Sequence, residues 1–263
     1  MLLDITPTGK EIKRSAFLEK SSKARNFFGG SLLLCIVAIC FGNYFRKTDK
    51  PQGSEVEQFV AMIISPGEQS VSQGTAFLLA KYDGTSSGYL LTARHVIDNN
   101  RMNGTVTLLF PKLLNEKGEP IITTASIKWK TDIPFDSSNS GSFTFDVALL
   151  KLDDLSTLPD SITGFTITND MELKQPIAIF GFPQAEAFYT QGVVSNTEYE
   201  GNTNLMVMSF QFDRGISGAP VYNEESGDAL GIAIAGNGKL ANIALKITRV
   251  IDLIERDNLK ILE

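Results

Sequence analysis

The stretch YLLTARHVID, residues 89–98, begins with a short apolar run and contains the only histidine of this 263-residue chain, His95. Short apolar runs broken by Gly, Pro, Asn and Asp are typical of strands and turns, and the same pattern repeats along the chain after residue 55. Eleven or twelve strands in one chain favour closed barrels or a sandwich. We therefore predict an all-β fold.

The predicted strands cover residues 59–65, 74–82, 88–93, 105–110, 121–129, 144–152, 175–182, 190–199, 205–212, 229–236 and 242–248. Residues 249–258 (RVIDLIERDN) have the apolar spacing of a helix and predict one C-terminal helix. The stretches 111–119 and 132–142 interrupt the strand pattern. We predict ordinary surface loops there, and the alternative is that these loops border a cleft.

An uncharged stretch of 19 residues lies near the N-terminus, at 27–45. As a helix it would be about 28 Å long, which is enough to cross a bilayer. The alternative, a cleaved signal peptide, would have a shorter apolar core and a small-residue cleavage site, and none follows Phe41. We therefore expect a cytoplasmic tail (1–26), a transmembrane helix (27–45), a linker (46–56) and a folded domain (57–263).

The charges that flank residues 27–45 predict the orientation of this anchor. Six cations precede it and three follow it closely. The positive-inside rule then puts the tail in the cytoplasm. We expect a single-pass protein of the inner membrane, held in the lipid bilayer by residues 27–45, with its folded domain in the periplasm or otherwise outside the cytoplasm.

The composition excludes several kinds of partner and cofactor. The chain has 24 Lys plus Arg and 30 Asp plus Glu; the first 50 residues hold 9 and 4 of these, so the remainder carries a net charge of −11. Such an acidic domain is a poor candidate for binding nucleic acid. Both cysteines, Cys35 and Cys40, lie in the predicted anchor, so the exported domain has no thiol. With one histidine and no thiol, we expect no metal site and no cofactor.

The stretch DRGISGAPVY, residues 213–222, supplies a candidate nucleophile for His95 to activate. Ser217 lies between Gly215 and Gly218. Glycines on both sides let the backbone turn tightly and bring N–H groups close to a substrate carbonyl. The pattern indicates a nucleophilic serine beside an oxyanion hole, although a sequence of this kind also occurs in ordinary turns.

The candidate carboxylate is Asp146, at the start of an apolar run in FTFDVALLKL (143–152). A charge buried in such a run needs a strong partner. His95 is one, since Asp146 can accept a hydrogen bond from its Nδ1–H while Nε2 accepts the proton of Ser217. The remaining carboxylates considered lie in polar surroundings and are weaker candidates: Asp132, Asp136, Asp153 and Asp154.

These motifs resemble those of the chymotrypsin-like (trypsin-like) serine peptidases, in particular the bacterial, disulfide-free type. The resemblance covers about residues 57–255. It rests on the following stretches: GTAF (74–77), LTARHV (91–96), DVAL (146–149), IFGFP (179–183), QGVVS (191–195), GISGAPV (215–221) and LGIA (230–233).

The resemblance implies two six-stranded antiparallel β-barrels with the active site in the crevice between them. It makes His95 the general base and acid, Asp146 its orienting carboxylate and Ser217 the nucleophile. The backbone N–H groups of Gly215 and Ser217 become the oxyanion hole, and the substrate is a protein or peptide. Arg94 takes the place of a residue that is commonly small in the family. We predict that it is a solvent-facing charge, and the alternative is a contact beside the cleft.

The primary specificity pocket is predicted from residues just before Ser217 and from the strand 231–236. Its candidate lining residues are Gln211, Phe212, Asp213, Ile234 and Ala235. The apolar members suggest a preference for small or apolar side chains, and Asp213 argues for a basic one.

The sequence thus predicts a membrane-anchored serine endopeptidase. The alternative is a catalytically silent or partner-gated binding or sensor protein on the same fold.

Overall fold

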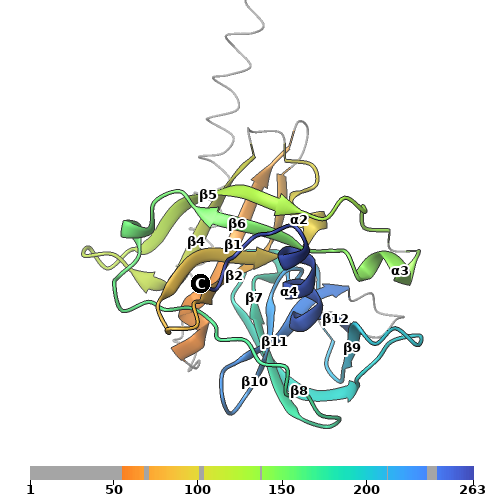
Figure 1. Ribbon diagram of the computed structural model, residues 1–263. Coiled ribbons are helices and arrows are strands. Elements are labelled where there is room, and N and C mark those ends of the chain that lie inside the picture. Colours follow the sequence, from red (N-terminus) through yellow and green to blue (C-terminus); the bar gives the residue numbers. More distant parts are fainter. Residues whose placement is uncertain (1–54, 68–70, 101–103, 137, 212, 236–241) are drawn as a thin grey trace, which may run out of the picture. The chain divides into compact units, whose positions relative to one another are not determined.

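The computed structural model describes residues 55–67, 71–100, 104–136, 138–211, 213–235 and 242–263 (Figure 1). They form two closed barrels of six antiparallel strands each, which confirms the predicted all-β fold. The predicted anchor at residues 27–45 lies outside the described residues. No helix within the described ranges is long and apolar enough to span a bilayer.

The first barrel follows a short 3-10 helix, η1 (Glu55–Phe59), and has the strand order β1-β2-β3-β6-β5-β4. Two short helices lie between its strands: α2 (Arg94–Ile97) after β3 and α3 (Ser140–Phe143) before β6. Its strands are β1 (Val60–Pro66), β2 (Val71–Ala80), β3 (Ser86–Thr92), β4 (Thr105–Leu114), β5 (Pro120–Lys130) and β6 (Ala148–Leu152).

The second barrel has the strand order β10-β11-β12-β9-β8-β7. Its strands are β7 (Pro176–Gly181), β8 (Phe188–Asn196), β9 (Leu205–Met208), β10 (Pro220–Asn223), β11 (Ala229–Ala235) and β12 (Asn242–Lys246). Two more 3-10 turns, η2 (Leu155–Thr157) and η3 (Pro183–Ala185), lie in loops. The predicted C-terminal helix is present as α4 (Ile247–Arg256), which packs on β11 and β12 through its buried Val250 and Ile254.

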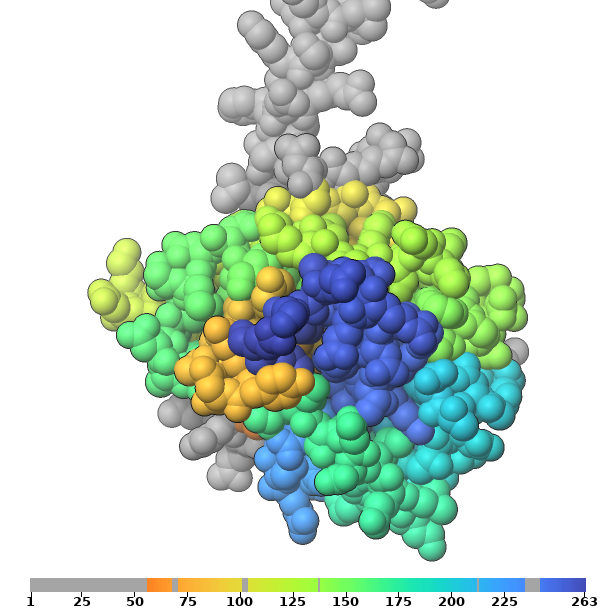
Figure 2. Space-filling view, viewed as in Figure 1, coloured from red at the N-terminus to blue at the C-terminus, as the bar shows by residue number. Residues whose placement is uncertain are grey.

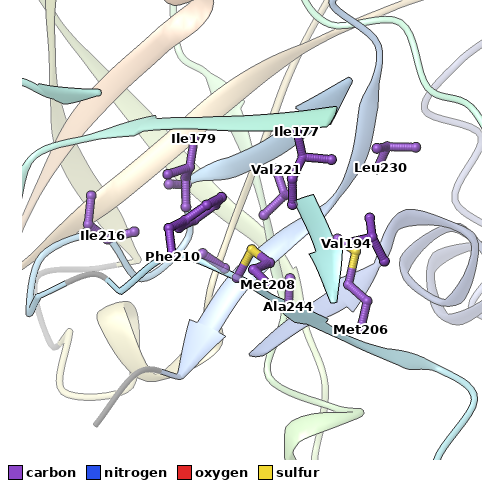
Figure 3. Close-up of a cluster of buried hydrophobic side chains, with 12 residues drawn as sticks. Ile177, Ile179, Val194, Met206, Met208, Phe210, Ile216, Val221, Leu230 and Ala244 are labelled. Atoms are coloured by element: carbon purple, nitrogen blue, oxygen red, sulfur yellow. The ribbon is translucent and has the colours of Figure 1, made fainter. Parts of the chain in front are cut away.

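Each barrel encloses apolar side chains. In the first, Phe77, Phe110 and Leu90 are fully buried. In the second, twelve side chains from its six strands and neighbouring loops pack together (Figure 3). Ile216 belongs to this second cluster with no exposed surface. The residue immediately before Ser217 is therefore anchored in a barrel core, which restricts where the serine can lie.

The segment between β6 and β7, which links the two barrels, contributes a buried side chain to their packing. Phe165 is buried, and its ring centroid lies 5.4 Å from that of Phe77 in β2 and 5.6 Å from that of Tyr222 in β10. Gly164 has φ +119°, and a Cβ there would lie 2.5 Å from the carbonyl carbon of Leu79. A bare backbone at this point lets the linker lie directly against β2, so Phe165 joins the cores of both barrels.

The C-terminal residues lie against the first barrel. The backbone N–H of Tyr82 donates to the carbonyl oxygen of Leu262, at 3.0 Å. Figure 2 shows these last residues in dark blue beside the β2–β3 hairpin in orange.

Several elements differ from the sequence prediction. The strand β4 continues to Leu114, so the first part of the loop predicted at 111–119 is strand. The strand predicted at 144–152 begins only at Ala148, because residues 144–147 turn back, with Asp146 N–H bonded to the Phe143 carbonyl. The strand predicted at 205–212 ends at Met208. The sequence pattern does not predict β10, because its four residues follow a glycine-rich turn and are too few to show alternation.

Candidate active site

His95 lies in α2, which begins directly after β3 with Ala93 as its N-cap. Ala93, Val96 and Ile97 are buried and fix this short helix on the barrel, whereas the His95 side chain is 28% exposed. The apolar residues around the histidine therefore hold its backbone, and the imidazole remains accessible.

Asp146 makes two hydrogen bonds to His95. One carboxylate oxygen accepts from the His95 backbone N–H at 2.9 Å, and the other lies 2.6 Å from Nδ1. The Asp146 side chain has no exposed surface. An ionised carboxylate only accepts hydrogen bonds, so Nδ1 is the donor beside it, and Nε2 is the atom that holds the free lone pair of a neutral imidazole. The structure thus brings together two of the three residues predicted to act in catalysis, in the predicted arrangement.

Ser217 lies in a turn whose shape requires glycine on both sides. Gly215 has φ +103°, and a Cβ there would lie 2.5 Å from the Phe182 carbonyl oxygen. Gly218 has φ +89°, and a Cβ there would lie 2.1 Å from the Thr75 carbonyl oxygen. Positive φ and close backbone approach are both conditions that only glycine meets without strain. The two glycines are needed for the conformation that presents Ser217.

The serine turn and the histidine helix are neighbours across the two barrels. A Cβ at Gly74 would lie 2.6 Å from a Val96 methyl group and 3.0 Å from the Ser217 carbonyl oxygen. A Cβ at Gly218 would likewise lie 2.9 Å from the backbone nitrogen of Ala93, the N-cap of α2. Among the hydrogen bonds of the described residues, none joins the Ser217 hydroxyl to the His95 imidazole. In ligand-free enzymes such contacts are often long and tighten on substrate binding.

Thr75 of the first barrel fixes the carbonyl groups of the serine turn. Its backbone N–H donates to the Ser217 carbonyl oxygen at 2.9 Å, and its hydroxyl donates to the Gly215 carbonyl oxygen at 2.8 Å. The Phe182 N–H donates to the same hydroxyl at 3.3 Å. Within the described ranges, the N–H groups of Gly215 and Ser217 have no hydrogen-bond acceptor. Two backbone donors are therefore available beside Ser217.

The residues predicted to line the specificity pocket are only partly described. Gln211 and Asp213 are exposed, and Ile234 is buried in β11. Phe212 and the side chain of Ala235 lie outside the described residues. The strand β11 does run beside the serine turn, because the Gly218 N–H donates to the Ala233 carbonyl oxygen at 2.8 Å.

The prediction that Arg94 is a solvent-facing charge is wrong. Arg94 is only 8% exposed, and its Nε donates to Asp98 at 2.9 Å, one helical turn further along. The short helix α2 packs its first residue against the barrel, and Asp98 supplies the counter-charge that allows this burial.

Sequence reasoning misses two residues that contact this site. Thr75 is visible in the sequence only as part of the GTAF motif, and a threonine beside a glycine does not indicate a functional role.

Phe135 lies in the polar stretch 132–142, and its ring centroid is 4.8 Å from that of His95. A large aromatic residue in a polar loop is a usable signal, because such residues often mark binding or catalytic surfaces. The alternative that this loop borders the site fits the structure better than an ordinary surface loop.

The two-barrel fold, with a buried aspartate bonded to an accessible histidine beside a glycine-flanked serine, defines a class, the chymotrypsin-like proteins. The family model for the trypsin-like peptidase domain matches residues 74–232, more than half of the chain. The chain belongs to this family of trypsin-like peptidase domains. No protein with a curated description matches it in sequence.

Several solved structures share the fold. A serine endoprotease from Yersinia pestis has 19% identity and a TM-score of 0.53, over 76% of this chain and 63% of the other. The MamO protease domain from Magnetospirillum magneticum has 16% identity and a TM-score of 0.55, over 75% and 96%. An inactive mutant form of Rv3671c from M. tuberculosis has 14% identity and a TM-score of 0.53, over 79% and 90%. The chain thus spans less than two thirds of the Yersinia protein.

Proposed function

We propose that this protein is a membrane-anchored serine endopeptidase that cleaves peptide bonds with Ser217, His95 and Asp146. The observation that carries the proposal is the buried Asp146 carboxylate, which bonds both the backbone N–H and Nδ1 of His95 next to the serine turn. This pairing leaves Nε2 as the only ring atom able to take a proton. It supports the role of general base, for which the chain has no second histidine.

In the proposed reaction Ser217 Oγ attacks the carbonyl carbon of the scissile peptide bond while His95 Nε2 takes the hydroxyl proton. Asp146 stabilises the imidazolium that results. The imidazolium then gives its proton to the leaving amine, the C–N bond breaks and an acyl-enzyme remains. Water attacks the acyl-enzyme with His95 again as base, which releases the acid product and regenerates Ser217.

The Gly215 and Ser217 N–H groups would bind the negative oxygen of the tetrahedral intermediate. Their freedom from other acceptors in the described residues, and the hold of Thr75 on the carbonyls of both residues, support this role. Removal of one such donor typically lowers kcat about 10²- to 10³-fold. No cofactor or metal is needed for this chemistry.

Labelling with a fluorophosphonate tests the nucleophile directly. The full-length native chain should react at one serine, and Ser217→Ala should not react. His95→Ala should react far more slowly, because the serine then lacks its base. Equal labelling of all three proteins would overturn the assignment of Ser217.

A catalytically silent or partner-gated protein on the same fold is the second candidate. The observation in its favour is that Ser217 Oγ and His95 do not form a hydrogen bond in this structure. An absence of labelling in the native chain, restored by addition of a binding partner, would support this candidate. Labelling of the purified native chain alone would exclude it.

We also propose that residues 27–45 anchor the chain in the inner membrane, with the peptidase domain outside the cytoplasm. The support is the uncharged length of this stretch and the excess of cations before it. Protease added to intact spheroplasts should degrade the domain and spare a cytoplasmic control protein. Protection of residues 51–263 until the membrane is lysed would overturn the proposed topology.

A further inference from the structure

The segment between β5 and β6 makes two separate contacts with the imidazole of His95. Asp146, at its end, bonds the ring edge at Nδ1. Phe135, near its beginning, lies over the ring, with centroids 4.8 Å apart and ring planes inclined by 35°. The Asp146 contact fixes one atom of the ring, and the Phe135 contact restricts rotation of the ring plane.

Phe135 is itself held by contacts within this segment. Its ring stacks on that of Phe143, with centroids 5.3 Å apart and planes inclined by 18°, and Phe143 is buried. The next residue, Asp136, donates its backbone N–H to the Ser142 hydroxyl at 2.9 Å. The Ser142 hydroxyl in turn lies 2.9 Å from the Asp136 carbonyl oxygen. These bonds join Asp136 to Ser142 next to Phe135. They restrict the backbone that carries the Phe135 ring.

The face of an aromatic ring attracts a cation that lies within about 6 Å of its centroid. In the proposed reaction the neutral imidazole of His95 takes the serine proton and becomes positively charged. Phe135 therefore interacts more strongly with the protonated ring than with the neutral one. An interaction that strengthens as the reaction proceeds raises the rate, whereas one of constant strength does not.

We propose that Phe135 is a positioning residue for His95: it holds the plane of the imidazole and favours the protonated ring formed during the reaction. The inference rests on the proposed function, because it gives Phe135 a role in the step that protonates His95. An aliphatic side chain of similar size would cover the imidazole without supplying an aromatic face. The aromatic character of residue 135, rather than its bulk, should therefore matter.

The test compares Phe135→Leu, which removes the aromatic ring, with Phe135→Tyr, which keeps it. Tyr82→Leu is the matched control, because it removes an exposed aromatic ring at a different place. Tyr82 follows the last residue of β2, Ala80, whereas Gly74, which lies close to the serine turn, is near the start of that strand. The first measurement is the NMR spectrum of the full-length chain labelled at histidine. Since the chain has one histidine, its imidazole gives one set of ring-proton signals. Ring currents from the aromatic side chain at position 135 should shift these signals upfield in the native chain, in Phe135→Tyr and in the control, and the shift should be largely lost in Phe135→Leu.

The second measurement is the rate of fluorophosphonate labelling of Ser217, with a probe that has no peptide portion to occupy the cleft. We expect Phe135→Leu to react about two- to fivefold more slowly than the native chain. Phe135→Tyr and Tyr82→Leu should react within about twofold of it. This pattern separates the aromatic contact from a general loss of folding.

The two measurements fail in distinguishable ways. If the native imidazole shows no upfield shift, or if Phe135→Leu labels at the native rate, the role of Phe135 is overturned and the proposed function stands. If Phe135→Tyr is as slow as Phe135→Leu, the aromatic face is not the cause and the proposal fails. If the native chain does not label although its imidazole is shifted, the proposed function fails, and with it the proposed role of Phe135 in the reaction.

Discussion

Asp146→Asn is the most informative substitution in this protein, because it preserves the size of the side chain and changes only its hydrogen bonding. The carboxylate accepts two hydrogen bonds from His95, at 2.9 Å and 2.6 Å. An amide has one accepting oxygen and one donating nitrogen. If the oxygen keeps the backbone N–H of His95, the amide nitrogen must face Nδ1 as a donor. Nδ1 then has to accept, the proton moves to Nε2, and the ring cannot take the serine proton.

The expected loss of reactivity is large. The same tautomer error in a Ser-His-Asp triad lowers kcat about 10⁴-fold. At about 1.36 kcal/mol for each factor of ten, this corresponds to about 5.4 kcal/mol of lost transition-state stabilisation. The effect on folding should be much smaller, because a charged acceptor is exchanged for a neutral one at the same place. We expect a loss of about 2 kcal/mol in the free energy of unfolding.

The assay is the second-order rate of fluorophosphonate labelling, measured beside a urea unfolding curve for each protein. Asp160→Asn, which makes the same change at an exposed position, is the matched control and should label at the native rate. Labelling of Asp146→Asn within about threefold of the native chain would refute the assignment of Asp146 as the orienting carboxylate. A rate that falls only in proportion to a loss of folded protein would refute it as well.

Four further predictions follow from the contacts around this site and in the barrels. Gly218→Ala should abolish labelling, because its methyl group would meet the Thr75 carbonyl oxygen at 2.1 Å, whereas Gly201→Ala, with positive φ but open space, should label normally. Thr75→Val should slow labelling about tenfold or more through loss of a hydrogen bond worth about 1.5 kcal/mol, and Thr75→Ser should retain the native rate. Phe165→Ala should lower the free energy of unfolding by about 3–5 kcal/mol in guanidinium titrations; a loss below about 1 kcal/mol would contradict its place between the two cores. Hydrogen bonds from two hydroxyl groups of β5 lower the pKa of Asp153, so the stability that they contribute is present above the ordinary carboxyl value of about 3.9 and is lost as the pH falls through the lower folded value. The difference in Tm between the native chain and Asp153→Asn should therefore shrink as the pH falls below about 3.9, and a constant difference would contradict this origin.

The barrels could be predicted because their strands follow a local pattern. Strands such as β3 and β7 show an apolar run bounded by turn residues. Where a strand begins or ends because of contacts with distant residues, the local pattern of apolar residues does not show the boundary. Residues 144–147 directly precede the apolar residues of β6 but turn back, and the Asp146 carboxylate bonds to His95. The four residues of β10 escape prediction because their strand exists through pairing with β7 and β11.

The candidate site could be predicted where its chemistry requires a particular residue type. A lone histidine, an aspartate in an apolar run and a serine between glycines are unusual enough to be noticed together. Supporting contacts require only a shape or a backbone group, so many residue types could supply them. Thr75 acts on two carbonyl oxygens 140 residues or more away in the chain, and no local pattern records such a contact. The burial of Arg94 likewise depends on a partner, Asp98, whose position follows from the short helix.

The hold of Thr75 on the serine turn makes the shape of this turn depend on how the two barrels are placed. The histidine and the aspartate come from the first barrel and the serine from the second, and the conformation of the serine turn depends on a threonine of the first. A slight separation of the barrels would break the Thr75 bonds to Gly215 and Ser217. The serine turn could therefore be displaced without any contact to Ser217 or His95 themselves.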